Sequence, residues 1–335
     1  MQQLFVKPGA EGLLSPLQPW LTDPDVAEIM INAPGEVFVE RRGKITQHQL
    51  TMLTPLYLQR LFQFIANEAQ QRLDETNPML AGNLFDGSRV QLVIPPISSH
   101  HTLTIRRQSI RALTLTDYSA KNFYQHLQAV TQLNNTEAFT GDYEQELLTL
   151  YQQKQWDPFI KLAIACRKTI VISGGTSSGK TTFLNACLQE IDHSERLILL
   201  EDTRELVAPH ANMVSLLAAN SEQSKAKVNM QQLVQCSLRL RPDRLIMGEI
   251  RGREIMDFIS ACATGHEGSF TSIHANNPYI AMLRMVQMYK QNNVPSMRDE
   301  EIRTELNSVI DIILQLNKTK NGRIAKYCYY KAAVY

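Results

Sequence analysis

Apolar and polar residues alternate over short stretches in the first third of the chain, a pattern typical of half-buried strands. Residues 36–40, 89–94 and 102–106 are predicted to be strands, the second of which ends before a Pro-Pro pair. Residues 25–30 are short and mixed in polarity, and we expect them to begin a helix ahead of a turn. The first third of the chain therefore holds the strands of a small sheet.

A helical spacing replaces this alternation between Pro55 and Arg72, where apolar residues recur at intervals of three and four. The spacing predicts an amphipathic helix that covers one face of the sheet. Its apolar residues are Leu58, Leu61, Phe62, Ile65 and Ala69. We therefore predict a small α+β domain over residues 1–112.

The pattern changes twice beyond this domain. Residues 113–155 are polar, rich in Gln, Asn and Thr and weakly periodic, so we expect a partly helical linker. Over residues 156–335 apolar strands alternate with helical segments, which predicts a parallel-rich sheet with helices on both faces and a closing hairpin at Asn321-Gly322. The sequence thus predicts an α/β protein, and its 335 residues suffice for two domains.

The strongest chemical signal is a G-x-x-x-x-G-K-[ST] segment between an apolar strand and a helical segment that includes Thr182. Glycines allow backbone N–H groups to close around phosphate oxygens, and the helix N-terminus adds partial positive charge. We predict that this P-loop binds Mg-ATP, with Lys180 at the phosphates and the Thr181 hydroxyl on Mg²⁺. Its residues are Gly174, Gly175, Thr176, Ser177, Ser178, Gly179, Lys180 and Thr181.

Two acidic residues end apolar strands that follow the P-loop. Glu201 ends the first of these strands, and Glu249 ends the second. The C-terminal ends of parallel strands line the ligand crevice, so both carboxylates are expected to face the phosphates. Hydrolysis needs a metal anchor and a residue that orients water, and this pair can divide the two tasks. Helix capping is the alternative role for either acid alone.

Histidines and arginines provide further candidates for contacts with the phosphates. His266 and His274 lie in the segment 264–276, where a contact with the γ-phosphate and a purely structural role are both open. Arg89 and Arg106 lie at the edges of predicted strands in the first domain. A neighbouring domain or subunit can bring arginine to γ-phosphate charge, whereas a solvated surface position is the usual alternative.

Composition argues against several other classes of protein. The net charge is +1 and no basic stripe with interleaved aromatic residues is present, so we expect no stable binding of nucleic acid. The five cysteines include no C-x-x-C pair, which argues against a zinc module and a disulfide framework. The N-terminal residues lack the pattern of a secretory signal, and we expect a cytoplasmic protein.

In this order the motifs resemble the secretion traffic ATPases, which include type IV secretion ATPases, type II secretion ATPases and pilus-retraction motors. The sequences of residues 31–35 and 266–269 are more similar to those of the type IV secretion members. The four-cysteine zinc module that is usual in type II members is absent from the sequence. Pilus-retraction motors also lack zinc and stay an alternative. The resemblance rests on residues 29–37, 87–90, 173–182, 201–206, 239–244, 248–252 and 264–276.

The resemblance implies a RecA-like P-loop domain and Mg-dependent hydrolysis of ATP to ADP and phosphate by a homo-hexameric ring. This ring would power assembly of, or substrate transfer through, a bacterial type IV secretion system. Its partners would be inner-membrane secretion-channel proteins and a coupling ATPase, which would hold it at the cytoplasmic side of the inner membrane. A P-loop also fits a nucleic-acid translocating ring ATPase and a nucleotide switch without hydrolysis, and both functions stay open.

The resemblance also assigns roles to individual residues. Glu201 is implied as the general base and Glu249 as the acid on the metal side, although the reverse assignment stays open. His274 is implied near the γ-phosphate, with support from His266. The remaining implied contacts to the γ-phosphate come from Arg89 and Arg106.

Overall fold

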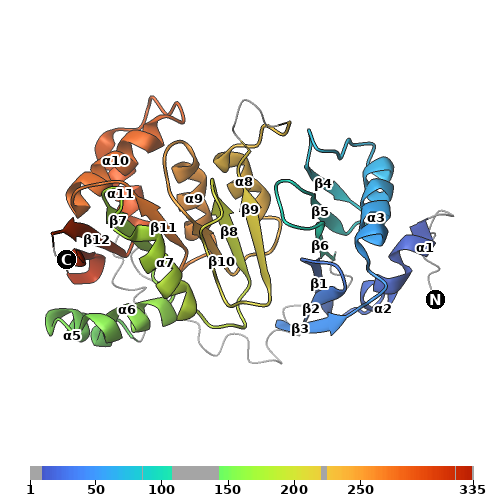
Figure 1. Ribbon diagram of the computed structural model, residues 1–335, viewed down its shortest axis with the longest axis horizontal. Coiled ribbons are helices and arrows are strands. Elements are labelled where there is room, and N and C mark those ends of the chain that lie inside the picture. The colour runs from blue at the N-terminus through green and yellow to red at the C-terminus, as the bar shows by residue number, and fades with distance from the viewer. Residues whose placement is uncertain (1–9, 85, 108–142, 220–224, 321, 334–335) are drawn as a thin grey trace, which may run out of the picture.

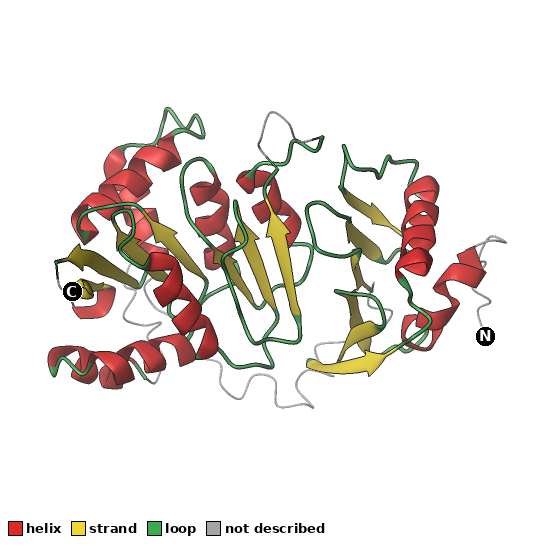
Figure 2. Cartoon of the chain, in the orientation of Figure 1, coloured by secondary structure: helices red, strands yellow, loops and turns green. Residues whose placement is uncertain are grey.

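The computed structural model describes residues 10–84, 86–107, 143–219, 225–320 and 322–333. These residues form two units that lie side by side, each built on its own sheet (Figure 1, Figure 2). Most of the expected linker lies outside the described residues. The expected α/β fold, with a parallel-rich sheet preceded by a smaller α+β unit, is confirmed.

The first unit is a six-stranded antiparallel sheet with the order β3-β2-β1-β6-β5-β4. Short helices precede it, and α3 covers one face, as the helical spacing predicts. The Thr54 hydroxyl caps α3 by accepting from the Tyr57 amide at 3.2 Å. The elements are α1 (Ala10–Leu14), η1 (Ser15–Leu17), α2 (Gln18–Leu21), β1 (Val26–Ile31), β2 (Glu36–Arg41), β3 (Lys44–Gln49), α3 (Pro55–Glu68), β4 (Met79–Asn83), β5 (Arg89–Val93) and β6 (Thr102–Arg106).

The helix expected to begin within residues 25–30 is wrong, because this segment is strand β1. It lies inside the sheet and pairs with β2 on one side and β6 on the other. Residues 28–31 are all buried, so the alternation that marks a half-buried strand is missing from its sequence.

The second unit is a seven-stranded sheet with the order β13-β12-β7-β11-β10-β8-β9, parallel except for the hairpin strand β13. Buried residues of α5, α6 and α7 pack on one face, and those of α8, α9, α10 and α11 pack on the other. The strands are β7 (Ile170–Gly174), β8 (Leu197–Glu201), β9 (Met213–Leu217), β10 (Arg244–Met247), β11 (Phe270–Ile273), β12 (Ile312–Thr319) and β13 (Gly322–Tyr330).

The helices of the second unit begin before the expected domain start at residue 156. Helix α5 lies within the span predicted as linker, yet its Leu147 belongs to the same core as Phe159 of α6. The Tyr151 hydroxyl also donates to the Cys328 carbonyl at 2.7 Å. The helices are α5 (Glu144–Gln152), α6 (Trp156–Ala165), α7 (Lys180–Gln189), α8 (Met230–Ser237), α9 (Glu254–Ala263), α10 (Pro278–Lys290), α11 (Asp299–Val309) and η3 (Lys331–Ala333).

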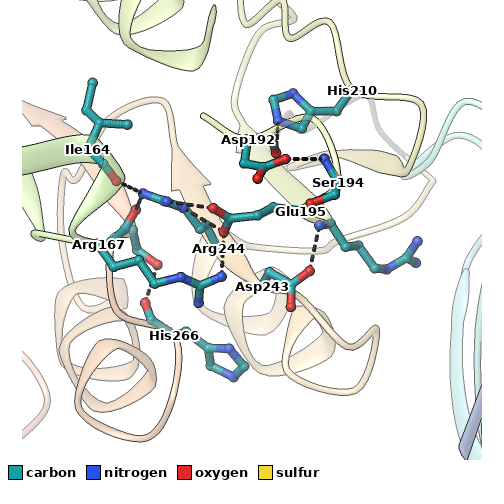
Figure 3. A network of polar contacts seen from close by, with 12 residues as sticks. Ile164, Arg167, Asp192, Ser194, Glu195, His210, Asp243, Arg244 and His266 are labelled. Carbon is teal, nitrogen blue, oxygen red and sulfur yellow. Dashed lines mark hydrogen bonds and ion pairs between the residues drawn. The ribbon is translucent and has the colours of Figure 1, made fainter. Parts of the chain in front are cut away.

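A buried ion-pair network fixes the amino-terminal end of β10 (Figure 3). The Arg244 guanidinium is 1% exposed and donates to both oxygens of Glu195, at 2.7 and 2.9 Å. It also donates to the Ile164 carbonyl at 2.9 Å, so it ties β10 to the end of α6. Arg167 also donates to Glu195 Oε2, at 2.7 Å. A guanidinium buried in this way needs its acceptors, which makes the network structural.

The two units contact each other along strand β9. The Ile97 carbonyl of the first unit accepts from the Leu217 amide at 2.8 Å, and Val93 and Ile97 belong to the core of the second unit. Deeper in the interface, Arg196 donates from Nη1 to Asn32 Oδ1 at 2.8 Å and from Nε to the Leu240 carbonyl at 2.8 Å. The first unit therefore rests on the open edge of the parallel sheet.

None of the helices in the described ranges combines the length and the apolar character that crossing a membrane requires.

Candidate nucleotide site

The P-loop joins β7 to α7 at the carboxyl edge of the parallel sheet (Figure 1). Its backbone turns through positive φ angles of 59° at Ser177 and 91° at Gly179. A Cβ atom at Gly174 would lie 2.3 Å from Ser178 Oγ and 2.8 Å from the Leu316 carbonyl oxygen, so only glycine fits there. The loop is thus a closed backbone cradle at a helix N-terminus, the arrangement that binds phosphate.

A cavity of about 260 Å³ opens beside this cradle. It brings together residues that were predicted from the sequence to form the site. From the P-loop and the ends of three neighbouring strands come Lys180, Thr181, Glu201, Glu249 and His274. Parallel strands deliver their carboxyl ends to one edge, which explains why residues far apart in sequence meet here. The cavity is also lined by the predicted P-loop residues Thr176 and Ser177, and further by Asp202, Thr203, Glu205, Leu206, Gly248, Arg251 and Ser272.

Lys180 is held at the mouth of the loop. Its Nζ atom donates to the Gly174 carbonyl at 3.2 Å and lies 3.4 Å from each ring nitrogen of His274. Burial lowers the pKa of Lys180, and the nearby Glu249 carboxylate partly opposes that shift. The ammonium group therefore lies between the P-loop carbonyls and His274, at the wall of the cavity.

A line of polar contacts continues from His274 across the cavity. His274 Nε2 lies 3.2 Å from Glu249 Oε1, and Arg251 Nη2 lies 3.0 Å from Glu249 Oε2. Arg251 Nη1 in turn lies 2.9 Å from Asp202 Oδ2. Burial lowers the pKa of His274, while the Glu249 carboxylate acts in the opposite direction. The cavity thus presents cationic and anionic groups in alternation.

Glu201 lies in the same cavity but is engaged differently. The residue is 3% exposed, and its Oε1 accepts from the backbone amides of Glu205 and Leu206 at 2.7 and 2.6 Å. Oε2 accepts from the Ser215 hydroxyl at 3.0 Å. Asn185 of α7 holds the same loop from the other side through the Glu205 carbonyl, at 2.8 Å. Glu201 therefore shapes the loop after β8.

Two arginines expected at the γ-phosphate lie away from the cavity of their own chain. Arg106 ends β6, where its Nε donates to Glu28 Oε1 at 2.5 Å, and Arg89 is its exposed partner on β5. Neither residue lines the nucleotide cavity. The end of the first sheet that carries them faces the amino-terminal side of β10, where Arg241 binds Glu40 at 2.6 Å.

His266 likewise does not support His274. It lies in the network around Arg244 at the amino-terminal end of the parallel strands (Figure 3). His266 precedes β11 and His274 follows it, so the strand separates the two rings and places them at opposite edges of the sheet. Burial lowers the pKa of His266, which fits a structural residue.

Arg251 and Arg323 lie at the site but were not among the predicted site residues. Arg251 lies two positions after Glu249, within a segment on which the resemblance rests, and contacts Asp202, the acid directly after β8. Arg323 comes from the closing hairpin, lies against Gly179 and donates from Nε to the Ser177 carbonyl at 3.2 Å. No motif connects Arg323 with the P-loop, because only the pairing of β12 with β7 brings the hairpin there.

A phosphate cradle at the carboxyl edge of a parallel sheet, with lysine and strand-end acids around it, defines a P-loop protein with a RecA-like domain. Residues 13–326 match the family described as Type II/IV secretion system protein. The chain therefore belongs to this family.

Relatives with similar sequences narrow the family further. The chain is 36% identical over 310 residues to the type IV secretion system protein VirB11 of Brucella suis biovar 1 (strain 1330), covering 91% of this chain and 84% of that protein. It is 33% identical over 310 residues to the type IV secretion system protein PtlH of Bordetella pertussis (strain Tohama I), with coverages of 91% and 89%. The expected resemblance to type IV secretion traffic ATPases is confirmed.

A solved structure shows the same fold over almost the whole chain. The crystal structure of the VirB11 ATPase from the Brucella suis type IV secretion system, in complex with sulphate, has a TM-score of 0.89. It is 33% identical to this chain, and the match covers 97% of this chain and 96% of that chain. Both units of the fold are therefore common to the two proteins.

Proposed function

We propose that this chain hydrolyses Mg-ATP as a subunit of a homo-hexameric ring that powers assembly of, or substrate transfer through, a bacterial type IV secretion system. The observation that carries the proposal is the contact line from Lys180 through His274 to Glu249 beside the P-loop. A phosphate cradle alone fits any nucleotide-binding protein, whereas strand-end acids beside it fit hydrolysis. The similarity to VirB11 and PtlH supports the link to type IV secretion.

The residues around the cradle divide the binding tasks. Lys180 Nζ, now bonded to loop carbonyls, would donate to phosphate oxygens, together with the amides of the P-loop. Thr181 and Glu249 provide the oxygen donors that Mg²⁺ prefers, and both line the cavity. When bound, Mg²⁺ neutralises charge on the phosphates.

The two acids differ in their contacts. Glu249 meets Lys180 through His274, which supports a role in holding Mg²⁺ or its water. Glu201, predicted as the general base, accepts three hydrogen bonds from the loop that follows β8 and from Ser215, and these bonds compete with a role as base. The Glu201→Gln variant distinguishes a general base from a residue that only organises the loop. Glutamine cannot act as the base, but it keeps an acceptor for the amides and can donate to the Ser215 hydroxyl.

The proposal is tested by steady-state ATP hydrolysis, with mass in solution recorded with and without Mg-ATP. We expect turnover by a hexamer and a loss of about a hundredfold or more in Lys180→Ala. A comparable loss in Glu201→Gln, with ATP binding retained, would support Glu201 as base; near-normal turnover would leave it the organiser of its loop. A monomer that binds ATP without turnover would contradict the ring motor and favour a nucleotide switch.

Within this proposal the ring works at the cytoplasmic side of the inner membrane, held there by secretion-channel proteins and a coupling ATPase. The net charge of +1 provides no general attraction to nucleic acid. We therefore expect single-stranded DNA to leave the rate of ATP hydrolysis unchanged. A stimulation that falls steeply with salt would favour the nucleic-acid translocase instead.

A further inference from the structure

The nucleotide cavity shares a wall with a second, larger cleft of about 620 Å³. Three residues line both spaces, Asp202, Glu249 and Arg251. The far side of the larger cleft is formed by residues of α8, of α9 and of the turn before α9, among them Asn229, Gln231, Arg253 and Glu254. The wall between the two spaces is therefore made of two carboxylates and one guanidinium.

Arg251 bridges the two carboxylates of this wall. Its Nη1 atom lies 2.9 Å from Asp202 Oδ2, and its Nη2 atom lies 3.0 Å from Glu249 Oε2. The two acids follow different strands, β8 and β10, so the guanidinium connects the carboxyl ends of both. Without a cation between them, two carboxylates beside a phosphate site would repel each other and the nucleotide.

The side chain of Arg251 is anchored at its base and open at its tip. The amides of Arg251 and Gly252 both donate to Glu254 Oε1, at 2.6 and 2.8 Å, which fixes the backbone before α9. The side chain is 62% exposed, against 34% for Asp202 and 16% for Glu249. The hydrogen bond to Glu249 raises the pKa of Arg251, so the group stays charged. Its tip can leave the acids without moving the chain.

We infer that Arg251 is a positioning residue that holds Asp202 and Glu249 as a resident cation, and releases Glu249 when Mg-nucleotide occupies the cavity. The inference rests on the proposed nucleotide function of this cavity. It adds that Glu249 exchanges Arg251 for Mg²⁺ or its water when the nucleotide binds. Glu249 has one oxygen directed at His274 and the other at Arg251, so Mg²⁺ or its water competes with these two partners for the carboxylate. Arg251 is the more exposed of these partners.

A purely structural clip between two loops is the competing role for Arg251. Such a clip would affect stability and leave the cooperation between Mg²⁺ and nucleotide unchanged. A resident cation, by contrast, competes with Mg²⁺ for Glu249. Its removal leaves uncompensated negative charge, which weakens binding of free nucleotide and increases the benefit that Mg²⁺ brings.

The test measures this benefit by nucleotide binding, independently of turnover. The dissociation constant of an ATP analogue with a β,γ-imido bridge is determined by calorimetry at fixed ionic strength, with excess Mg²⁺ and with EDTA. The dissociation constant in EDTA divided by the dissociation constant in excess Mg²⁺ defines the coupling, so a larger ratio means a larger benefit from Mg²⁺. We expect Arg251→Ala to increase the coupling by about twofold to fivefold, since partly exposed ion pairs are screened. Arg251→Lys retains the charge and should restore most of the wild-type ratio.

Two further variants make the result specific. Arg253→Ala removes the same charge two positions away, from the far side of the larger cleft, and should leave the coupling unchanged. Asp202→Asn removes one negative charge from the wall and should lower the coupling. Thermal unfolding of every variant would check that the fold is retained.

The outcomes separate this inference from the proposed function. Equal coupling in wild type and Arg251→Ala, or an equal change in Arg253→Ala, would overturn the role of Arg251 whatever the turnover. Wild-type protein that binds the analogue but does not hydrolyse ATP would contradict the proposed hydrolysis and leave the comparison of variants valid. Absence of analogue binding would overturn both.

Discussion

Burial determines how several histidines of this chain titrate. His101, His210, His266 and His274 all have pKa values below the usual value for histidine, in each case mainly because burial disfavours the charged ring. His210 is 5% exposed, and its Nε2 atom donates to the Asp192 carbonyl at 3.1 Å. Burial therefore favours the neutral ring of His210, and protonation would place a charge in the interior.

This burial predicts a loss of stability on acidification. The unfolded chain takes up these protons near pH 6.5, whereas the folded chain takes them up at lower pH, so stability present above about pH 6.5 is lost as the pH falls through the folded pKa values. We expect the free energy of unfolding by urea to be lower at pH 5.5 than at pH 7.5. Replacement of His210 by Asn should reduce that difference, and a difference unchanged in this variant would show that His210 does not contribute.

Single residues of the site were predictable where their signal is contiguous. The P-loop lysine and threonine, the strand-end acids and His274 lie inside recognisable motifs, and the structure gathers them in one cavity. Arg251 and Arg323 act through contacts with residues distant in sequence, Asp202 and Ser177. One sequence contains no information on such contacts until the order of strands is known.

At the scale of elements, capping residues fix where helices begin. Helix α10 starts directly after the segment that carries His274, and Asn277 Oδ1 accepts from the Ile280 amide at 2.9 Å. Pro278 occupies the first helical position, where no amide is needed. The start of α10 is thus tied to the position of the segment at the nucleotide cavity.

We predict that Asn277→Ala lowers the free energy of unfolding by about 1 kcal/mol, because the helix loses its side-chain cap. Asn277→Asp is the matched control, since its carboxylate keeps the acceptor and suits the helix N-terminus. Urea unfolding followed by circular dichroism measures both variants. Equal loss in the two would mean that the cap does not account for the effect.

Elements were predictable in proportion to the regularity of their burial. Helix α3 buries one face, so its spacing is visible in the sequence. Strand β1 is an interior strand whose last four residues are all buried, which hides the period of a strand. Helix α5 buries Leu147 and leaves most of its other side chains partly or fully exposed, which is too weak a pattern to distinguish it from linker.

At the scale of the whole molecule, a buried arginine joins the two units. Arg196 is 0% exposed, burial lowers its pKa, and its Nη1 atom donates to Asn32 in the first unit. Asn32 also donates to Asn212 Oδ1 at 2.9 Å. Asn32 lies in the segment Ile-Asn-Ala-Pro-Gly of residues 31–35, so these contacts place part of that segment at the interface between the units.

Removal of the Asn32 side chain is expected to weaken this interface. Asn32→Ala leaves a buried guanidinium N–H with one acceptor fewer, at a cost of about 1–3 kcal/mol in the free energy of unfolding. Urea unfolding should show an earlier midpoint, and the transition should broaden if the units separate. A midpoint within error of wild type would contradict a stabilising role for this contact.

The positions of Arg89 and Arg106 lead to a prediction about the proposed ring. Because neither lies at the cavity of its own chain, we propose that they serve the site of a neighbouring chain. Arg106→Ala and Lys180→Ala should each be nearly inactive, and their mixture should regain turnover at sites that combine an intact P-loop with an intact arginine. A mixture no more active than its components would argue against sharing between chains.

The contact between Ile97 and strand β9 has a consequence for how the chain is made. Strand β9 ends the parallel sheet, and an uncovered strand edge invites pairing with other molecules. The covering segment belongs to the first unit, which leaves the ribosome before β9 does, so the edge meets a folded neighbour as it emerges. A fragment that starts at residue 143 should lack this protection and aggregate during expression, where the full chain does not.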